Sequence, residues 1–382
     1  MVKVTNLIKA ATLVLSVLAA MPALSKASKE EAIQKILPQL ENKIVATMKA
    51  AGIPGVAVAI VSSDKVYYIK GFGVKKIGKT DKITPATLFQ IASLSKPVNA
   101  TMLAVLQDKG KLSFDDSVAR YLPSFRLRTQ KQPLKICHIV SHSTGVPNSG
   151  FEDQIGKFAP RENIIRRLQK TYPVAQPGKR FIYHNAMYGV LEDIIVKASG
   201  KPYERALQED LFKPLGMKSA CTGLKALMNA PDKAYPHVPN YRGRYVPAEK
   251  YSSGYYAFRA AGGVNASIQD MSAFLQVYLG KSSHIVSRKS LHEVTSPFVK
   301  NPKAVITSEV RKGLITNTFY GYGWQSMNYG NQKIIYHQGH LKGFRNFMGY
   351  LPNDVGIVIL TNADRKHASK IALKFFELYL NA

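Results

Sequence analysis

The chain has 382 residues, of which 46% are hydrophobic, so it is long and apolar enough to bury a large core. Apolar and aromatic residues occur throughout, without repeats or low-complexity tracts, which excludes a disordered or repetitive protein. A net charge of +29 predicts either attraction to anionic cell-envelope polymers or an adaptation for solubility, and the scatter of the basic residues argues against a nucleic-acid partner.

The first 27 residues have the pattern of a secretory signal. Lys3 and Lys9 precede an apolar run over residues 10–24, and small residues follow as a cleavage site requires. The run is shorter than the ~20 residues that span a bilayer, and no cysteine lies there for lipid attachment. We therefore predict a signal peptide over residues 1–27, no stable transmembrane anchor, and a periplasmic or secreted protein. An uncleaved membrane anchor is the alternative.

A helix and a hairpin are predicted next. Hydrophobic residues recur at helical spacing over residues 29–51, and Gly52 ends the pattern. Apolar runs over residues 56–61 and 66–70 are typical of strands, and the turn Ser62-Ser63-Asp64 joins them. The chain thus opens with one amphipathic helix and two neighbouring strands.

Helical patterns dominate the middle of the chain. Beyond a helix that begins near Ser93 and ends near Gly110, we expect helices over residues 134–141, 161–170, 187–199 and 203–212. Residues 223–259 are rich in Pro, Tyr and Gly, which predicts a long ordered loop or cap.

The last part of the chain returns to strands. After a tight turn at residues 261–264, Ser267 and Asp270 form the pattern of a capping box that opens a helix through Leu279. We then expect strands over residues 320–327, 333–337, 344–351 and 355–361, and a helix over residues 364–380.

These elements predict an α+β fold. Strands from both chain ends most simply form one antiparallel sheet flanked by helices, with the helical middle as a second lobe. We expect a single domain over residues 28–382, with a sheet lobe over about 28–90 and 260–382 and a helical lobe over about 91–259.

The two cysteines give no disulfide framework. Cys137 lies in an apolar helical pattern and is predicted to be a buried thiol, and a single bond to Cys221 stays open.

One short motif carries candidate chemistry. Ser93 and Lys96 are three residues apart at the start of a helix, so the amine lies within reach of the hydroxyl. Burial between two lobes lowers the pKa of a lysine, which then accepts a serine proton. Ser62 and Lys65 have the same spacing, but they lie at a hairpin tip, where a structural role is expected.

Two further motifs lie downstream. In Tyr183-x-Asn185 a tyrosine beside an ammonium ionises more easily, and the asparagine is suited to hold a substrate amide. His337-x-Gly339 ends a strand, where a glycine lets a substrate backbone run alongside. The backbone N–H groups of His340 and Ser93 are candidates for an oxyanion hole.

Taken together, these motifs resemble those of the serine β-lactamase and penicillin-binding-protein superfamily, in its class C β-lactamase and DD-carboxypeptidase branch. The motifs, in chain order, are Ser93-x-x-Lys96, Tyr183-x-Asn185 and His337-x-Gly339. The resemblance covers roughly residues 30–380, and its supporting stretches are residues 139–145, 261–264, 320–324 and 357–362.

The resemblance implies a serine hydrolase without a cofactor, acting on cell-wall-type peptides or β-lactams. Ser93 would be acylated, Lys96 and Tyr183 would accept protons, Asn185 would bind the substrate amide, and residues 337–339 would line the acyl-binding strand.

One position departs from this pattern. In class C β-lactamases, which this chain resembles, the third motif is Lys-Thr-Gly, whereas this chain has His-Gln-Gly. By this resemblance, a neutral His337 would attract a substrate carboxylate less than a lysine would. Arg345 is a candidate for the positive charge that His337 lacks. The alternative is that Arg345 is an exposed strand residue without a role in substrate binding.

Other functions stay open beside this one. A carboxylesterase or D-aminopeptidase of the same fold is one alternative, and a penicillin- or peptidoglycan-binding protein without turnover is another. His138 and His142 are four residues apart, but no Glu lies between them as in a metalloprotease helix, so we expect no metal.

Overall fold

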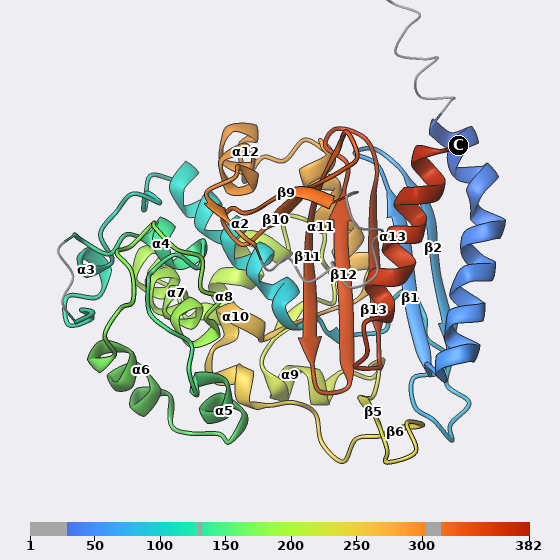
Figure 1. Cartoon of the computed structure of the whole chain (residues 1–382), viewed down its shortest axis with the longest axis horizontal. Coiled ribbons are helices and arrows are strands. Elements are labelled where there is room, and N and C mark those ends of the chain that lie inside the picture. The colour runs from blue at the N-terminus through green and yellow to red at the C-terminus, as the bar shows by residue number, and fades with distance from the viewer. Residues whose placement is uncertain (1–28, 129–131, 303–314) are drawn as a thin grey trace, which may run out of the picture.

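The computed structural model describes residues 29–128, 132–302 and 315–382 and shows a large antiparallel sheet beside a helical region (Figure 1). The signal peptide predicted over residues 1–27 lies outside the described residues. In the described part of the chain the large sheet has eight strands. In spatial order they are β2 (Val66–Gly73), β1 (Gly55–Val61), β13 (Gly356–Thr361), β12 (Phe344–Tyr350), β11 (Gln332–Leu341), β10 (Gln325–Tyr329), β9 (Ile315–Tyr320) and β8 (Val299–Lys300).

Both chain ends contribute to this sheet, as predicted. Strand β1 pairs antiparallel with β13, with Val58 opposite Ile359, and with β2 on its other side. Every residue of β1 is buried, which explains its uninterrupted apolar sequence, since a strand covered on both faces has no polar side.

Helices cover the two faces of the sheet. The first helix (residues 29–51) and α13 (His367–Leu380) pack on one face, where alternate residues of β1 such as Val56 and Val58 point (Figure 1). The other residues of β1, such as Ala57 and Ala59, face a larger core that includes α2 (Ser95–Asp108) and α11 (Ile268–Leu279). The helix α2 therefore joins the sheet to the helical region.

The remaining helices build the helical region and its margins. They are α3 (Val118–Tyr121), α4 (Ile136–Val140), α5 (Phe151–Gly156), α6 (Arg161–Lys170), α7 (Asn185–Ser199), α8 (Tyr203–Leu207), α9 (Leu224–Asn229), α10 (Arg259–Gly262) and α12 (Arg288–Thr295). A π-helical turn, η2 (Gln208–Phe212), continues α8, so the single helix expected over residues 203–212 changes its winding.

A second, small sheet brings distant segments together. Strand β3 (Phe89–Gln90) pairs with β7 (Val264–Ala266), which also pairs with β4 (Cys221–Thr222). Strand β3 leads directly into the 3₁₀ turn η1 (Ala92–Leu94), so the segment before β7 lies beside that turn.

The predicted strand over residues 320–327 is wrong. Residues 321–324 separate β9 from β10, and Gly323 has φ +75°, a left-handed conformation that glycine adopts without strain. At Gly321, a Cβ atom would lie 2.6 Å from the Ser296 carbonyl oxygen. Two glycines in close succession were the sign of a turn.

The cap region also differs from the prediction. Residues 223–259 contain α9, the hairpin of β5 (His237–Pro239) and β6 (Tyr245–Pro247), and the 3₁₀ turn η3 (Gly254–Ala257). These elements are too short to produce a periodic pattern. The expected tight turn at residues 261–264 is the end of helix α10 followed by β7.

Two other local predictions, the capping box and the buried Cys137 thiol, are confirmed. Ser267 and Asp270 form the reciprocal hydrogen bonds of a capping box at the start of α11. Cys137 is buried, and both it and the half-buried Cys221 are free thiols. Among the described residues, no helix is long and apolar enough to cross a bilayer.

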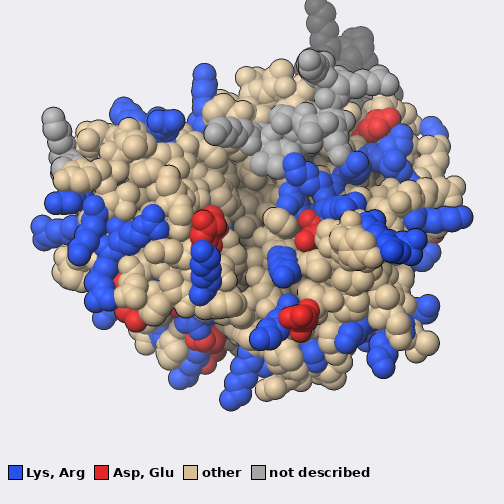
Figure 2. Space-filling model, turned by 60° about the horizontal axis from the view of Figure 1, so that its bottom comes forward, with Lys and Arg blue, Asp and Glu red and all other residues tan. Residues whose placement is uncertain are grey.

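Basic side chains are spread over the surface. Figure 2 shows one face with a central hollow, across which Lys and Arg outnumber Asp and Glu without gathering in a single patch. This distribution gives no single basic patch on the face shown, and attraction to anionic polymers stays a prediction.

Candidate active site

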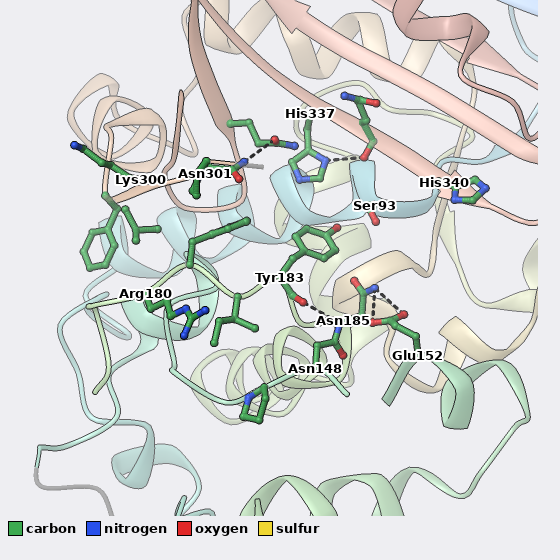
Figure 3. A pocket seen from close by; sticks show the side chains of 18 of the residues that line it. Ser93, Asn148, Glu152, Arg180, Tyr183, Asn185, Lys300, Asn301, His337 and His340 are labelled. Atoms are coloured by element: carbon green, nitrogen blue, oxygen red, sulfur yellow. Dashed lines mark hydrogen bonds between the residues drawn. The ribbon is translucent and has the colours of Figure 1, made fainter. Parts of the chain in front are cut away.

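Ser93 lies in the 3₁₀ turn η1, two residues before helix α2 begins at Ser95. The preceding residue, Ala92, has φ +55°, a conformation that is uncommon for a residue with a side chain and that often marks a functional turn. Ser93 faces a cavity of about 1110 Å³ between the sheet and the helical region. Figure 3 shows Ser93, Tyr183 and Asn185 close together, with Arg180 and Lys300 at the far end.

Lys96 lies beneath Ser93 and is completely buried. Its Nζ is 3.2 Å from Ser93 Oγ, 2.6 Å from Asn185 Oδ1 and 2.8 Å from the Ala261 carbonyl oxygen. Burial lowers the pKa of Lys96 to about 7, although the negative charge of Glu152 acts in the opposite direction. A large fraction of the amine is therefore a free base near neutral pH.

The three contacts fix the direction of this amine. A neutral lysine has two N–H hydrogens and one lone pair. The oxygens of Asn185 and Ala261 only accept hydrogen bonds, so they take the two N–H groups. The lone pair is then directed at the third neighbour, the Ser93 hydroxyl. This arrangement places a base at the serine proton.

Tyr183 lies beside the same amine. Lys96 Nζ is 4.6 Å from the centre of the Tyr183 ring, which lies 4.2 Å from the ring of His142. Burial raises the pKa of Tyr183 above its usual range, and a hydrogen bond with Ser93 only partly opposes this rise. The expectation that Tyr183 ionises easily is therefore wrong, because the effect of burial on its pKa is larger than that of the hydrogen bond with Ser93.

Asn185 begins helix α7 and makes contacts on both sides of its amide. Its Oδ1 faces Lys96, while its Nδ2 is 3.0 Å from each carboxylate oxygen of Glu152. Glu152 also accepts hydrogen bonds from Asn148 Nδ2, at 3.3 Å, and from the Tyr255 hydroxyl.

His337 is buried in β11 and is neutral. Its Nδ1 lies 2.8 Å from the Gln338 carbonyl oxygen, which only accepts, so Nδ1 carries the proton. Its Nε2 then accepts from the Tyr320 hydroxyl at 2.9 Å. Burial lowers the pKa of His337 to about 3. The ring thus brings no positive charge to the cavity.

Gly339 lies in close contact with the turn that carries Ser93. A Cβ atom at this position would lie 2.2 Å from the Ile91 carbonyl oxygen and 3.3 Å from the Cβ of Ala92. The absence of a side chain therefore lets strand β11 pack against that turn, and space for a substrate backbone stays a prediction.

The last two predicted residues lie opposite each other across the β11–β12 pair. His340 is paired with Arg345, and both line the cavity. Arg345 is mostly buried rather than an exposed strand residue, and its Nε–H has no hydrogen-bond partner among the described residues.

The second S-x-x-K match has structural partners only. Ser62 Oγ donates to Asp64 Oδ1 at 2.9 Å, and Lys65 pairs with Glu30 at 2.6 Å. These contacts close a surface turn, as expected.

The histidines of the helical region do not form a metal site. In the described ranges, no group of three or more His, Cys, Asp or Glu side chains is placed to hold a metal ion. His142 Nδ1 instead accepts from the His184 backbone N–H at 3.1 Å.

Three side chains of the site were missed in the sequence. Glu152 accepts hydrogen bonds from Asn185 and from Tyr255. Tyr320 is hydrogen-bonded to His337. Glu152 and Tyr255 come from segments that showed no motif, so no sequence signal identified them. Tyr320 belongs to a stretch that carried the family resemblance, but nothing there indicated its partner.

Comparison with known proteins places this geometry in a family. The family model described as Beta-lactamase matches residues 40–380. Protein flp of Staphylococcus aureus strain N315 is 24% identical over 341 residues, which are 87% of this chain and 64% of that protein. The chain thus spans less than two thirds of that relative's length.

Two solved structures are similar over most of the chain. The octameric penicillin-binding protein homologue from Pyrococcus abyssi has a TM-score of 0.80 and 28% identity, covering 90% of this chain and 77% of its own. D-alanine carboxypeptidase AmpC from Burkholderia cenocepacia has a TM-score of 0.70 and 20% identity, covering 91% and 99%, a likeness of fold alone. The family model, together with this fold, shows that the chain belongs to the Beta-lactamase family.

Proposed function

We propose that the chain is an exported serine hydrolase that forms an acyl-enzyme on Ser93 and cleaves an amide of cell-wall-type peptides or of β-lactams. The observation that carries this proposal is the position of Lys96. Its amine is buried, has a pKa of about 7 and lies 3.2 Å from Ser93 Oγ. A serine and a lysine that meet at the protein surface would lack this combination of a buried amine and a lowered pKa beside the hydroxyl.

The proposed reaction has two steps. Ser93 Oγ attacks the carbonyl carbon of the scissile bond while its proton passes to Lys96 Nζ, and the leaving group departs with that proton. Water then attacks the ester on Ser93, gives one proton to the base, and releases the acid product as the proton returns to Ser93 Oγ. Protonated Tyr183 is suited to donate a hydrogen bond to the leaving group, and the His340 and Ser93 N–H groups to stabilise the oxyanion.

The similar proteins support this substrate class. The solved neighbour at 28% identity is named a penicillin-binding protein homologue. We extend the binding of penicillin-type acyl donors that this name states to the present chain as part of the proposal.

A carboxylesterase or D-aminopeptidase is the second candidate, and His337 favours it. A buried, neutral ring whose two nitrogens are both engaged provides no cation for a substrate carboxylate. Acyl donors without a carboxylate, such as simple esters, need no such partner.

A substrate panel tests the proposal and separates the candidates. Nitrocefin, D-Ala-D-Ala peptides, D-aminoacyl anilides and p-nitrophenyl esters would be assayed with the wild type and with Ser93→Ala. The proposal predicts turnover of the peptides or nitrocefin, whereas turnover of esters or anilides alone supports the second candidate. Binding of penicillin without any turnover would favour a binding protein instead.

Arg345→Ala is expected to weaken the binding of carboxylated substrates selectively. A hydrogen bond to a charged group contributes about 1.5–3 kcal/mol, so we predict a KM rise of at least tenfold for peptides with a free carboxylate. The KM of a neutral ester should stay unchanged in the same variant. An unchanged KM for the carboxylated peptide would remove Arg345 from the binding site.

Export is part of the proposal and has its own test. The intact mass of protein recovered from the medium or periplasm should lack about the first 25–27 residues. A full-length mass in a membrane fraction would support the anchor instead.

A further inference from the structure

We propose that Glu152 is a positioning residue that sets the orientation of the Asn185 amide and, through it, the direction of the Lys96 lone pair. The proposal rests on the proposed function of Ser93 as a nucleophile. None of the sequence motifs contains Glu152, and it is the acidic residue among the described side chains that line the cavity.

The neighbours of Asn185 distinguish the two ends of its amide. An asparagine side chain is nearly symmetric in shape, so its neighbours decide which end is the oxygen. A carboxylate only accepts hydrogen bonds, and both Glu152 oxygens lie 3.0 Å from one end of the amide. That end must therefore be the NH₂ group, which leaves Oδ1 facing Lys96 Nζ at 2.6 Å.

The orientation of the Asn185 amide in turn sets the direction of the Lys96 amine. With Oδ1 facing it, Lys96 must direct an N–H toward Asn185, and its lone pair stays available for Ser93. With the amide reversed, the NH₂ group would face Lys96 and compete for that lone pair. An N–H would then point at Ser93 Oγ, and the amine would no longer be placed to accept the serine proton. The orientation of Asn185 thus determines whether Lys96 is a productive base.

Glu152 is itself held by hydrogen bonds from residues other than Asn185. Asn148 Nδ2 donates to Glu152 at 3.3 Å and to the Tyr183 backbone carbonyl at 2.9 Å, and the Tyr255 hydroxyl donates to the other carboxylate oxygen. Because three side chains donate to it, the carboxylate is fixed in place rather than free to rotate. No ion pair with a described residue competes for it within 4.0 Å.

Glu152 also acts on the amine through its charge. Its negative charge raises the pKa of Lys96, against the larger lowering by burial. The other titratable groups that face Lys96 are Tyr183 and Tyr188 at its ring contacts and the neutral His142 and His337. Tyr255 and His184 face Glu152 itself. Among the side chains named here, Glu152 is thus the one that places a negative charge near Lys96.

The test is Glu152→Gln, with Asp153→Asn as the matched control. Asp153 is exposed on the same helix, so the control makes the same charge change away from the cavity. For Glu152→Gln we expect kcat/KM to fall by up to about 100-fold, with intact folding by circular dichroism and thermal unfolding. Since less negative charge lowers the pKa of Lys96, the acid limb of the kcat/KM profile should shift to lower pH. Asp153→Asn should change neither quantity.

A second variant separates orientation from charge. Glu152→Asp keeps the charge but shortens the side chain, so kcat should fall while the pH midpoint stays close to that of the wild type. Rates and a pH midpoint of Glu152→Gln equal to those of the wild type would overturn the proposal. A loss confined to substrates with a free amino group, and absent for their N-acetyl forms, would also overturn it, because Glu152 would then contact the substrate.

Failure of this proposal is distinguishable from failure of the proposed function. Ser93→Ala is assayed beside these variants. If Ser93→Ala is inactive and Glu152→Gln is unaffected, only the role of Glu152 is wrong. If Ser93→Ala is fully active, the proposed function itself is wrong.

Discussion

Replacing Ser93 with alanine is expected to lower kcat/KM by more than about 10⁴-fold for every substrate that the protein turns over. The variant lacks the only atom from which the proposed acyl-enzyme forms. Its free energy of unfolding should change little, because the Ser93 side chain borders the cavity rather than the core. Steady-state rates for the wild type and the variant, measured with the substrate panel, give the result.

The matched control for this prediction is Ser62→Ala. Ser62 has the same S-x-x-K spacing, but its hydroxyl is bonded to Asp64 in a surface turn. We expect its activity to equal that of the wild type. Full turnover by Ser93→Ala would contradict the mechanism.

Lys96→Met is expected to lower kcat/KM by about 10² to 10⁴-fold, the range that a positioned general base contributes. Methionine fills a similar volume without a polar atom, so the buried site should remain packed. The Asn185 and Ala261 oxygens lose their donor, and Ser93 loses its proton acceptor. Lys65→Met, which removes a surface amine paired with Glu30, is the control and should keep its activity.

The pH dependence follows from the same lysine. Burial lowers the pKa of Lys96 to about 7, and only the unprotonated amine accepts the Ser93 proton. Wild-type kcat/KM should therefore be low at acid pH and increase with pH, with a midpoint near pH 7. In Lys96→Met, the residual rate should lack this midpoint. A wild-type profile that stays flat between about pH 5 and 9 would show that another group is the base.

Part of the site could be predicted because its residues lie within one helical turn of each other. Ser93 and Lys96 lie at the start of one helix, and Tyr183 and Asn185 lie at the start of another, which Asn185 begins. The pattern of apolar strands at both chain ends likewise predicted the antiparallel sheet, since β1 and β13 are both continuous apolar runs.

The rest depends on packing between distant segments. Glu152 meets Asn185 only because α5 packs beside the start of α7, and no spacing in the sequence records that contact. The close approach of Gly339 to the Ile91 carbonyl likewise arises from strand β11 lying on the turn η1. The high pKa of Tyr183 results from burial against segments that are distant in the sequence, which a local motif does not reveal.

The central claim is an acyl-enzyme on Ser93, and covalent labelling tests it most directly. The protein is incubated with a fluorophosphonate or fluorescent penicillin probe, digested, and mapped by mass spectrometry. We predict one adduct on the peptide that contains Ser93 in the wild type and in Ser62→Ala, and none in Ser93→Ala. An adduct on a different residue, or equal labelling of Ser93→Ala, would contradict the account.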